Sequence, residues 1–203
     1  MPNIIEPPAP GPYREPPPTP KRWTRRDCEF LVDNELLVGR YELIDGEIVS
    51  KMGQKPPHAV AIMRLTKWLV NLFGGDFVRI QLPIDVAEQD NEINEPEPDA
   101  VALAQPGEAY MAGNPDPVEV LLAIEVADSS LRFDLITKAA LYARAAILEF
   151  WVLDIVNRRL VVHRQPSGTG YAEILEYAET EQLAPISRPE SLVLVSDLLP
   201  PRS

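Results

Sequence analysis

The sequence predicts an α/β protein whose central mixed β-sheet is flanked by helices and carries added β-hairpins. Residues 118–127 form a nearly continuous apolar run, which is typical of a buried central strand. Residues 58–73 repeat apolar side chains at helical spacing, and residues 132–146 form a second helical pattern directly after the apolar run. Segments with the sequence pattern of β-strands precede and follow these two helical segments, so we expect helices packed on a sheet.

The composition is that of one globular domain: 203 residues, 45% of them hydrophobic and 25% charged. No apolar run approaches the roughly 20 residues that span a bilayer, so no membrane contact is expected. Cys28 is the only cysteine, which excludes an intramolecular disulfide and makes the reducing cytoplasm the expected location. The net charge of −12 argues against indiscriminate binding to nucleic acid, because phosphate contacts supply most of that affinity. It remains compatible with an acidic cleft that binds a cation.

The N-terminal segment differs from the rest of the chain. Residues 1–20 contain nine prolines and almost no large apolar side chains, so they cannot bury enough surface to offset the entropy of ordering. We therefore expect residues 1–22 to form a flexible proline-rich arm and residues 23–203 to form the folded domain. The folded part begins at Thr24 and Asp27, which are spaced like a helix capping box.

The first half of the domain is expected to contain a hairpin, a helix and short strands. Residues 41–51 predict the hairpin, because alternating side chains flank Asp45-Gly46, a pair that accepts the positive φ angles of a tight turn. The helix at residues 58–73 ends at Gly74, which tolerates left-handed geometry. His58, at the start of this helix, is expected to be a surface residue rather than a substrate contact. Strands are predicted at residues 77–81, 84–87 and 99–103.

The second half alternates strands with one helix. The buried strand at 118–127 leads into the helix at 132–146, and residues 149–156 and 160–164 then predict a second hairpin. Further strands are predicted at residues 171–177 and 192–195.

Glu125 is the most informative residue, because it lies inside the apolar run of the central strand. Removing a carboxylate from water costs several kcal/mol unless a cation or hydrogen-bond donors compensate. An acid at this place is therefore expected to hold a metal, a substrate or a buried partner. The alternative is that Glu125 lies at an exposed strand end.

Asp99 and Lys138 complete a candidate catalytic set with Glu125. Asp99 follows Pro98 and opens the short strand at 99–103, which can neighbour the strand of Glu125. Lys138 lies on the following helix, and the two-residue period of a strand puts Glu125 on a face that this helix can meet. Two carboxylates and a lysine are the parts needed for metal-assisted phosphodiester hydrolysis. The alternative for Lys138 is an exposed helical pair with Asp134, four residues earlier.

Five short motifs occur in an order that resembles a known family, the Uma-type putative restriction endonucleases of the PD-(D/E)xK nuclease superfamily. The resemblance covers roughly residues 24–200, and it is the order of the motifs rather than any one of them that is specific. The motifs are Tyr41-Glu-Leu-Ile-Asp-Gly-Glu47, Pro98-Asp99, Ile124-Glu125-Val126, Asp134-Leu-Ile-Thr-Lys138-Ala-Ala-Leu-Tyr142 and Glu149-Phe-Trp151-Val-Leu-Asp154.

The resemblance implies a restriction-endonuclease-like core that cleaves DNA with a divalent metal, Mg²⁺ or Mn²⁺. It implies that Asp99 and Glu125 are the metal ligands and that Lys138, displaced from the usual position two residues after the acid, orients the attacking water. It further implies that Glu47 is a supporting acid, while the role of Tyr142 is left open. By analogy with enzymes that cut both strands, a homodimer is expected.

One departure from the family pattern leaves a second function open. After Glu125 and Val126 the family usually continues Leu-Ser-Pro-Ser, whereas this chain reads Ala127-Asp-Ser-Ser130. Asp128 is therefore a loop residue, a further ligand or a sign of drift. The alternative function is a catalytically silent nuclease-fold module that binds DNA or protein.

Overall fold

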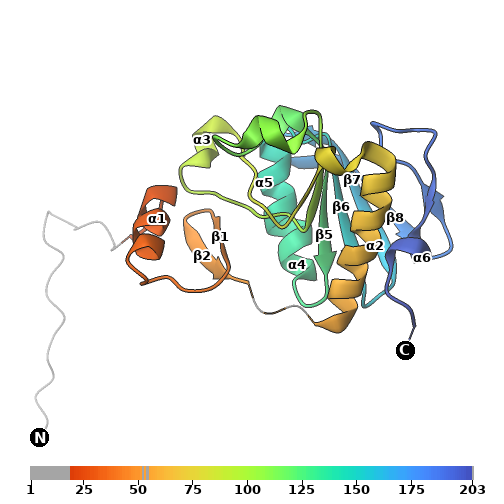
Figure 1. The fold of residues 1–203 in the computed structure, drawn as a ribbon, viewed down its shortest axis with the longest axis horizontal. Coiled ribbons are helices and arrows are strands. Elements are labelled where there is room, and N and C mark those ends of the chain that lie inside the picture. The colour runs from red at the N-terminus through yellow and green to blue at the C-terminus, as the bar shows by residue number, and fades with distance from the viewer. Residues whose placement is uncertain (1–18, 52, 54, 203) are drawn as a thin grey trace, which may run out of the picture.

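A computed structural model describes residues 19–51, 53 and 55–202 of the chain. Most of the expected proline-rich arm lies outside these residues. The domain is built on a six-stranded sheet in the order β3-β4-β5-β6-β7-β8, in which only β5 and β6 run parallel (Figure 1). The strands are β3 (Val78–Ile80), β4 (Ala100–Leu103), β5 (Val120–Ala127), β6 (Glu149–Asp154), β7 (Arg159–Ser167) and β8 (Gly170–Ala178).

Helices cover both faces of this sheet, which explains why its central strands are apolar throughout. On one face, α2 (Pro56–Phe73) buries Leu65 and Leu69 against strand residues that include Leu122 and Ile124. On the other face lie α4 (Leu131–Phe133), the π-helical turn η4 (Asp134–Lys138) and α5 (Ala139–Arg144), which form one continuous helical run (Figure 1). The predicted mixed sheet between helices is thereby confirmed.

A hairpin of β1 (Tyr41–Ile44) and β2 (Glu47–Ser50) stands beside the main sheet (Figure 1). Its turn uses positive φ angles of 49° at Asp45 and 77° at Gly46, as the dipeptide predicts. An isolated bridge between Leu43 and Glu95 joins the hairpin to the segment that leads into β4.

Short elements complete the domain. Helix α1 (Arg25–Asp33) begins with the predicted capping box, in which Thr24 and Asp27 exchange hydrogen bonds. The other short elements are α3 (Glu88–Asn91), η1 (Gly75–Phe77), η2 (Gly107–Tyr110), η3 (Pro117–Glu119), β9 (Gln182–Leu183), β10 (Val193–Leu194) and α6 (Val195–Leu198). Among the described residues, no helix combines the length and the apolar character needed to cross a bilayer.

Two predicted strands differ from the structure. Residues 84–87 form no strand, because the amide groups of Ile84 and Asp85 donate to carbonyls of Pro96 and Pro115 in loops instead of to a neighbouring strand. Near the C-terminus, only β10 of the predicted strand at 192–195 is extended, and α6 begins at Val195.

Candidate active site

A cavity of about 260 Å³ lies between the β1–β2 hairpin and one edge of the main sheet. Its walls come from the hairpin, the start of α2, the residue after β3, the residue before β4, the end of β5 and the first turns of the α4–α5 run. Asp99, Glu125 and Lys138 all line this cavity. The structure therefore brings together three residues that the sequence places on three separate elements.

Strand register places the two acids side by side. Strands β4 and β5 are antiparallel neighbours with Ala100 opposite Ile124, so one further step of the register sets Asp99 opposite Glu125. Their exposed fractions are only 5% and 3%. The alternative of an exposed acid at a strand end is therefore wrong for Glu125.

Asp99 is held as an anion by three donors. One carboxylate oxygen accepts the amide N–H of Val126 at 2.9 Å and faces Nε2 of His58 at 3.3 Å, while the other accepts Nε2 of Gln81 at 3.1 Å. Burial alone would raise the pKa of Asp99, but the contacts with His58, Val126 and Gln81 lower that pKa to about 2. Asp99 thus carries its negative charge at any pH near neutrality.

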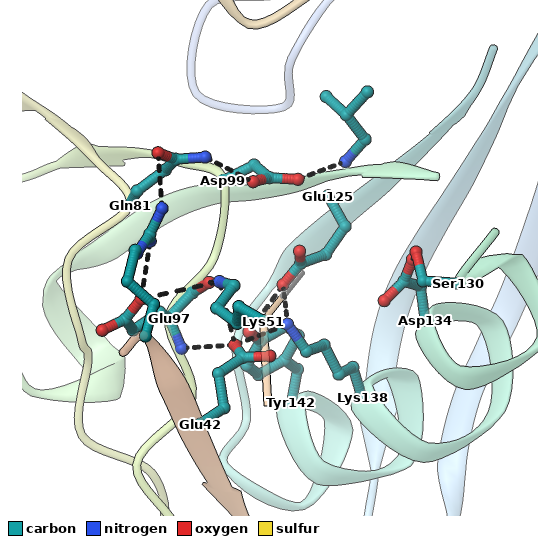
Figure 2. Close-up of polar contacts among 12 residues, drawn as sticks. Glu42, Lys51, Gln81, Glu97, Asp99, Glu125, Ser130, Asp134, Lys138 and Tyr142 are labelled. Carbon is teal, nitrogen blue, oxygen red and sulfur yellow. Dashed lines mark hydrogen bonds and ion pairs between the residues drawn. The ribbon is translucent and has the colours of Figure 1, made fainter. Parts of the chain in front are cut away.

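Glu125 has a different environment on the same cavity wall. Its Oε1 accepts hydrogen bonds from Nζ of Lys138 at 2.7 Å and from the hydroxyl of Tyr142 at 3.2 Å (Figure 2). Burial raises the pKa of Glu125 well above its ordinary value, and the Lys138 ammonium opposes this shift. The carboxylate therefore needs a cation beside it in order to stay charged.

Lys138 is buried on the last residue of the π-helical turn η4. Turns of π-helix are rare in proteins, and those that occur often lie at functional sites. The Lys138 ammonium lies 2.7 Å from Glu125 and 2.7 Å from Glu42 (Figure 2), and although burial lowers the pKa of Lys138, these two acids raise it above its ordinary value. The alternative of an exposed pair with Asp134 is wrong, because Asp134 is also buried and accepts its hydrogen bond from Ser130.

The supporting acid differs from the one that the family resemblance implied. Glu47 is exposed on β2 and does not line the cavity, whereas Glu42 on β1 is 4% exposed and reaches Lys138. Glu42 also accepts the amide N–H of Glu97 at 2.7 Å. One signal could have identified it: Glu42 stands next to Leu43 and Ile44 in a strand, a buried-acid context similar to that of Glu125.

His58 and Asp128 also line the cavity. His58 was expected on the surface, but its side chain is 15% exposed and it faces Asp99. Its contact with a carboxylate raises the pKa of His58, although burial acts to lower it. Asp128 lies on the cavity wall and pairs with Lys55 at 3.0 Å.

The donor set fits a hard divalent cation better than zinc. Among the residues that the structure describes, no three His, Cys, Asp or Glu side chains gather into a metal cage. The cavity instead offers two neighbouring carboxylates, Asp99 and Glu125. Mg²⁺ usually binds one or two carboxylates together with water and substrate oxygens, so this sparse set is sufficient.

Comparison with known proteins identifies the family of the chain and a similar fold. A solved structure of a putative nuclease belonging to DUF820 from Anabaena variabilis is similar in fold, with a TM-score of 0.59 at 16% sequence identity, over 83% of this chain and 96% of that chain. No curated protein matches the chain. The model of the Uma2 family, described as "Putative restriction endonuclease", matches residues 35–196. Because this match spans most of the sequence, the chain belongs to the Uma2 family.

Proposed function

We propose that this protein is a divalent-metal-dependent endonuclease that hydrolyses phosphodiester bonds in DNA. The observation that carries the proposal is the convergence of Asp99, Glu125 and Lys138, all buried, on one cavity. Three charged side chains kept away from water cost free energy that a purely structural role does not require. Membership in a family of restriction-endonuclease type supports the same reaction class.

In this proposal Asp99 and Glu125 hold Mg²⁺ or Mn²⁺. A divalent ion held there would supply neutralisation of charge on the phosphate and activation of the attacking water. Asp99 is ready for this role because its pKa of about 2 keeps it ionised, and a cation beside Glu125 favours the charged form of that carboxyl.

Lys138 acts as a donor rather than as a base. Its raised pKa keeps the ammonium protonated, so it cannot accept a proton from water at neutral pH. Two of its three N–H donors point to Glu42 and Glu125, and the third can orient the attacking water or bind a phosphate oxygen. Glu42 fixes the ammonium from the hairpin side of the cavity.

The test combines metal binding with cleavage. Asp99→Asn and Glu125→Gln should each abolish Mn²⁺ binding in calorimetry and cleavage of supercoiled plasmid, while circular dichroism shows a folded protein. Glu47→Gln is the matched control, because it neutralises an exposed acid of the same domain outside the cavity. Full Mn²⁺ affinity in either cavity variant would show that the residue is not a ligand.

The altered loop Ala127-Asp-Ser-Ser130 favours a second candidate, a silent nuclease-fold module that binds DNA or protein. Within that alternative, the net charge of −12 favours a protein partner over DNA. Such a module would bind no divalent cation in the same calorimetric titration. We also propose a homodimer, since cutting both strands of a duplex takes two active sites, and analytical ultracentrifugation of the full chain tests it. A monomer that makes double-strand breaks in one binding event would contradict the dimer.

A further inference from the structure

Gln81 continues a row of residues that runs across three strands to the candidate metal ligands. In the register of β3 and β4, Ile80 lies opposite Ala100, so Gln81 lies opposite Asp99. The backbone N–H of Gln81 donates to the backbone carbonyl of Asp99 at 3.2 Å. The register of β4 and β5 then sets Asp99 opposite Glu125. Gln81 therefore stands beside the acids although it lies at the end of the edge strand.

The backbone of Gln81 is in an unusual conformation. Its φ angle is 54°, in the left-handed region that residues other than glycine rarely adopt. Residues held in this region are strained, and they persist where surrounding contacts fix them, often at functional sites. Among the residues that the structure describes, Gln165 on β7 has almost the same φ angle, 58°, but is exposed and lies outside the cavity.

The side chain of Gln81 is fixed at both ends (Figure 2). Its Nε2 donates to Asp99 Oδ1 at 3.1 Å, and its Oε1 accepts Nη1 of Arg40 at 2.9 Å. A carboxylate only accepts and a guanidinium only donates, so the amide has one orientation that satisfies both partners. Arg40 is itself held by Glu97 through Nη2 at 2.7 Å.

We propose that Gln81 is a positioning residue that fixes the Asp99 carboxylate for cation binding, with Arg40 holding the Gln81 amide in its donating orientation. The inference rests on the proposed function, because it takes Asp99 as a metal ligand. With one Asp99 oxygen tied to Gln81 and the other to Val126, the carboxylate plane cannot rotate. Ligand-orienting hydrogen bonds of this kind contribute strongly to the affinity of metal sites.

The test is Mn²⁺ calorimetry on the full chain with the variants Gln81→Met and Gln81→Gly. Methionine keeps the length of the side chain but cannot donate, so affinity should fall by about 10–100-fold. Glycine removes the same donor and also relieves the left-handed backbone, so it should lose affinity to a similar extent while its Tm is not below that of Gln81→Met. Gln165→Met and Gln165→Gly are matched controls, and both should bind Mn²⁺ like the parent.

The outcomes separate this inference from the proposed function. Parent-like Mn²⁺ affinity in both Gln81 variants would overturn the positioning role, even if their Tm values fell, because a structural brace alone predicts a change in Tm only. Absence of Mn²⁺ binding in the parent would overturn the proposed function and this inference together. Equal losses of affinity in the Gln165 variants would also overturn the inference, since the effect would then be general.

Discussion

Replacing Lys138 with methionine tests the buried ion cluster most directly. The substitution preserves much of the side-chain volume but removes the ammonium that lies 2.7 Å from both Glu42 and Glu125. Glu42 keeps the amide of Glu97 at 2.7 Å and Lys51 at 3.5 Å, whereas Glu125 keeps only the Tyr142 hydroxyl among the described residues. Glu125 is therefore the group that the substitution leaves without a counter-charge.

The expected loss of stability is large for a single residue. Removing one partner of a buried ion pair costs about 3–5 kcal/mol, compared with about 0.2–0.5 kcal/mol for an exposed helical pair. At about 2–4 °C per kcal/mol for a domain of this size, Tm should fall by about 6–20 °C. Lys67→Met, at an exposed position on α2, is the control and should change Tm little.

The loss of stability in Lys138→Met should depend on pH, and its direction follows from the pKa of Glu125. Burial already raises the pKa of Glu125, and loss of the ammonium raises it further. The folded variant then binds a proton more tightly than the unfolded chain, so its stability deficit relative to the parent should shrink as pH falls from about 8 to about 5. Differential scanning calorimetry across this range measures the effect.

Activity provides the second readout for Lys138→Met. If the ammonium orients the water or stabilises charge in the transition state, plasmid cleavage with Mn²⁺ should slow by roughly 10²–10⁴-fold at a temperature where the variant is folded. A variant with parent-like Tm and parent-like cleavage would refute both the buried pairing and the catalytic role. A low Tm with an unchanged rate would leave Lys138 as a structural residue only.

Three more predictions follow from the same geometry. Glu42→Gln should lower Tm and cleavage while Glu47→Gln changes neither, and equal behaviour of the two in thermal melts and plasmid assays would refute the assignment of Glu42 to the site. Apparent Mn²⁺ affinity should fall as pH is lowered, and it should begin to fall above the ordinary titration range of a glutamate, because the pKa of Glu125 is raised and its protonated form is a poor ligand; a flat calorimetric profile would contradict this. Deleting residues 1–20 should lower Tm by less than about 8 °C, because that composition offers few core contacts, and a larger fall would show that the arm stabilises the domain.

Local rules in the sequence predicted much of the fold. The Asp45-Gly46 turn, the capping box at Thr24 and the amphipathic helix that became α2 all depend on neighbouring residues, and the structure contains each of them. The predicted strand at 84–87 is wrong because an apolar, alternating segment becomes a strand only if a neighbour supplies hydrogen bonds. Here Pro83 has no N–H, and the left-handed conformation at Gln81 comes just after the end of β3.

The sequence by itself indicated the family, through the order of five motifs. It also singled out Glu125, which lies inside a buried strand, and Asp99, which opens the neighbouring strand, because a carboxylate is costly at such places. Only the tertiary structure decided which other side chains join them. Glu42 rather than Glu47 reaches Lys138, and His58 and Gln81 face Asp99. These contacts depend on strand register and on how the hairpin packs against the sheet edge. Both are determined by residues that lie far apart in the chain, so no local sequence pattern encodes them.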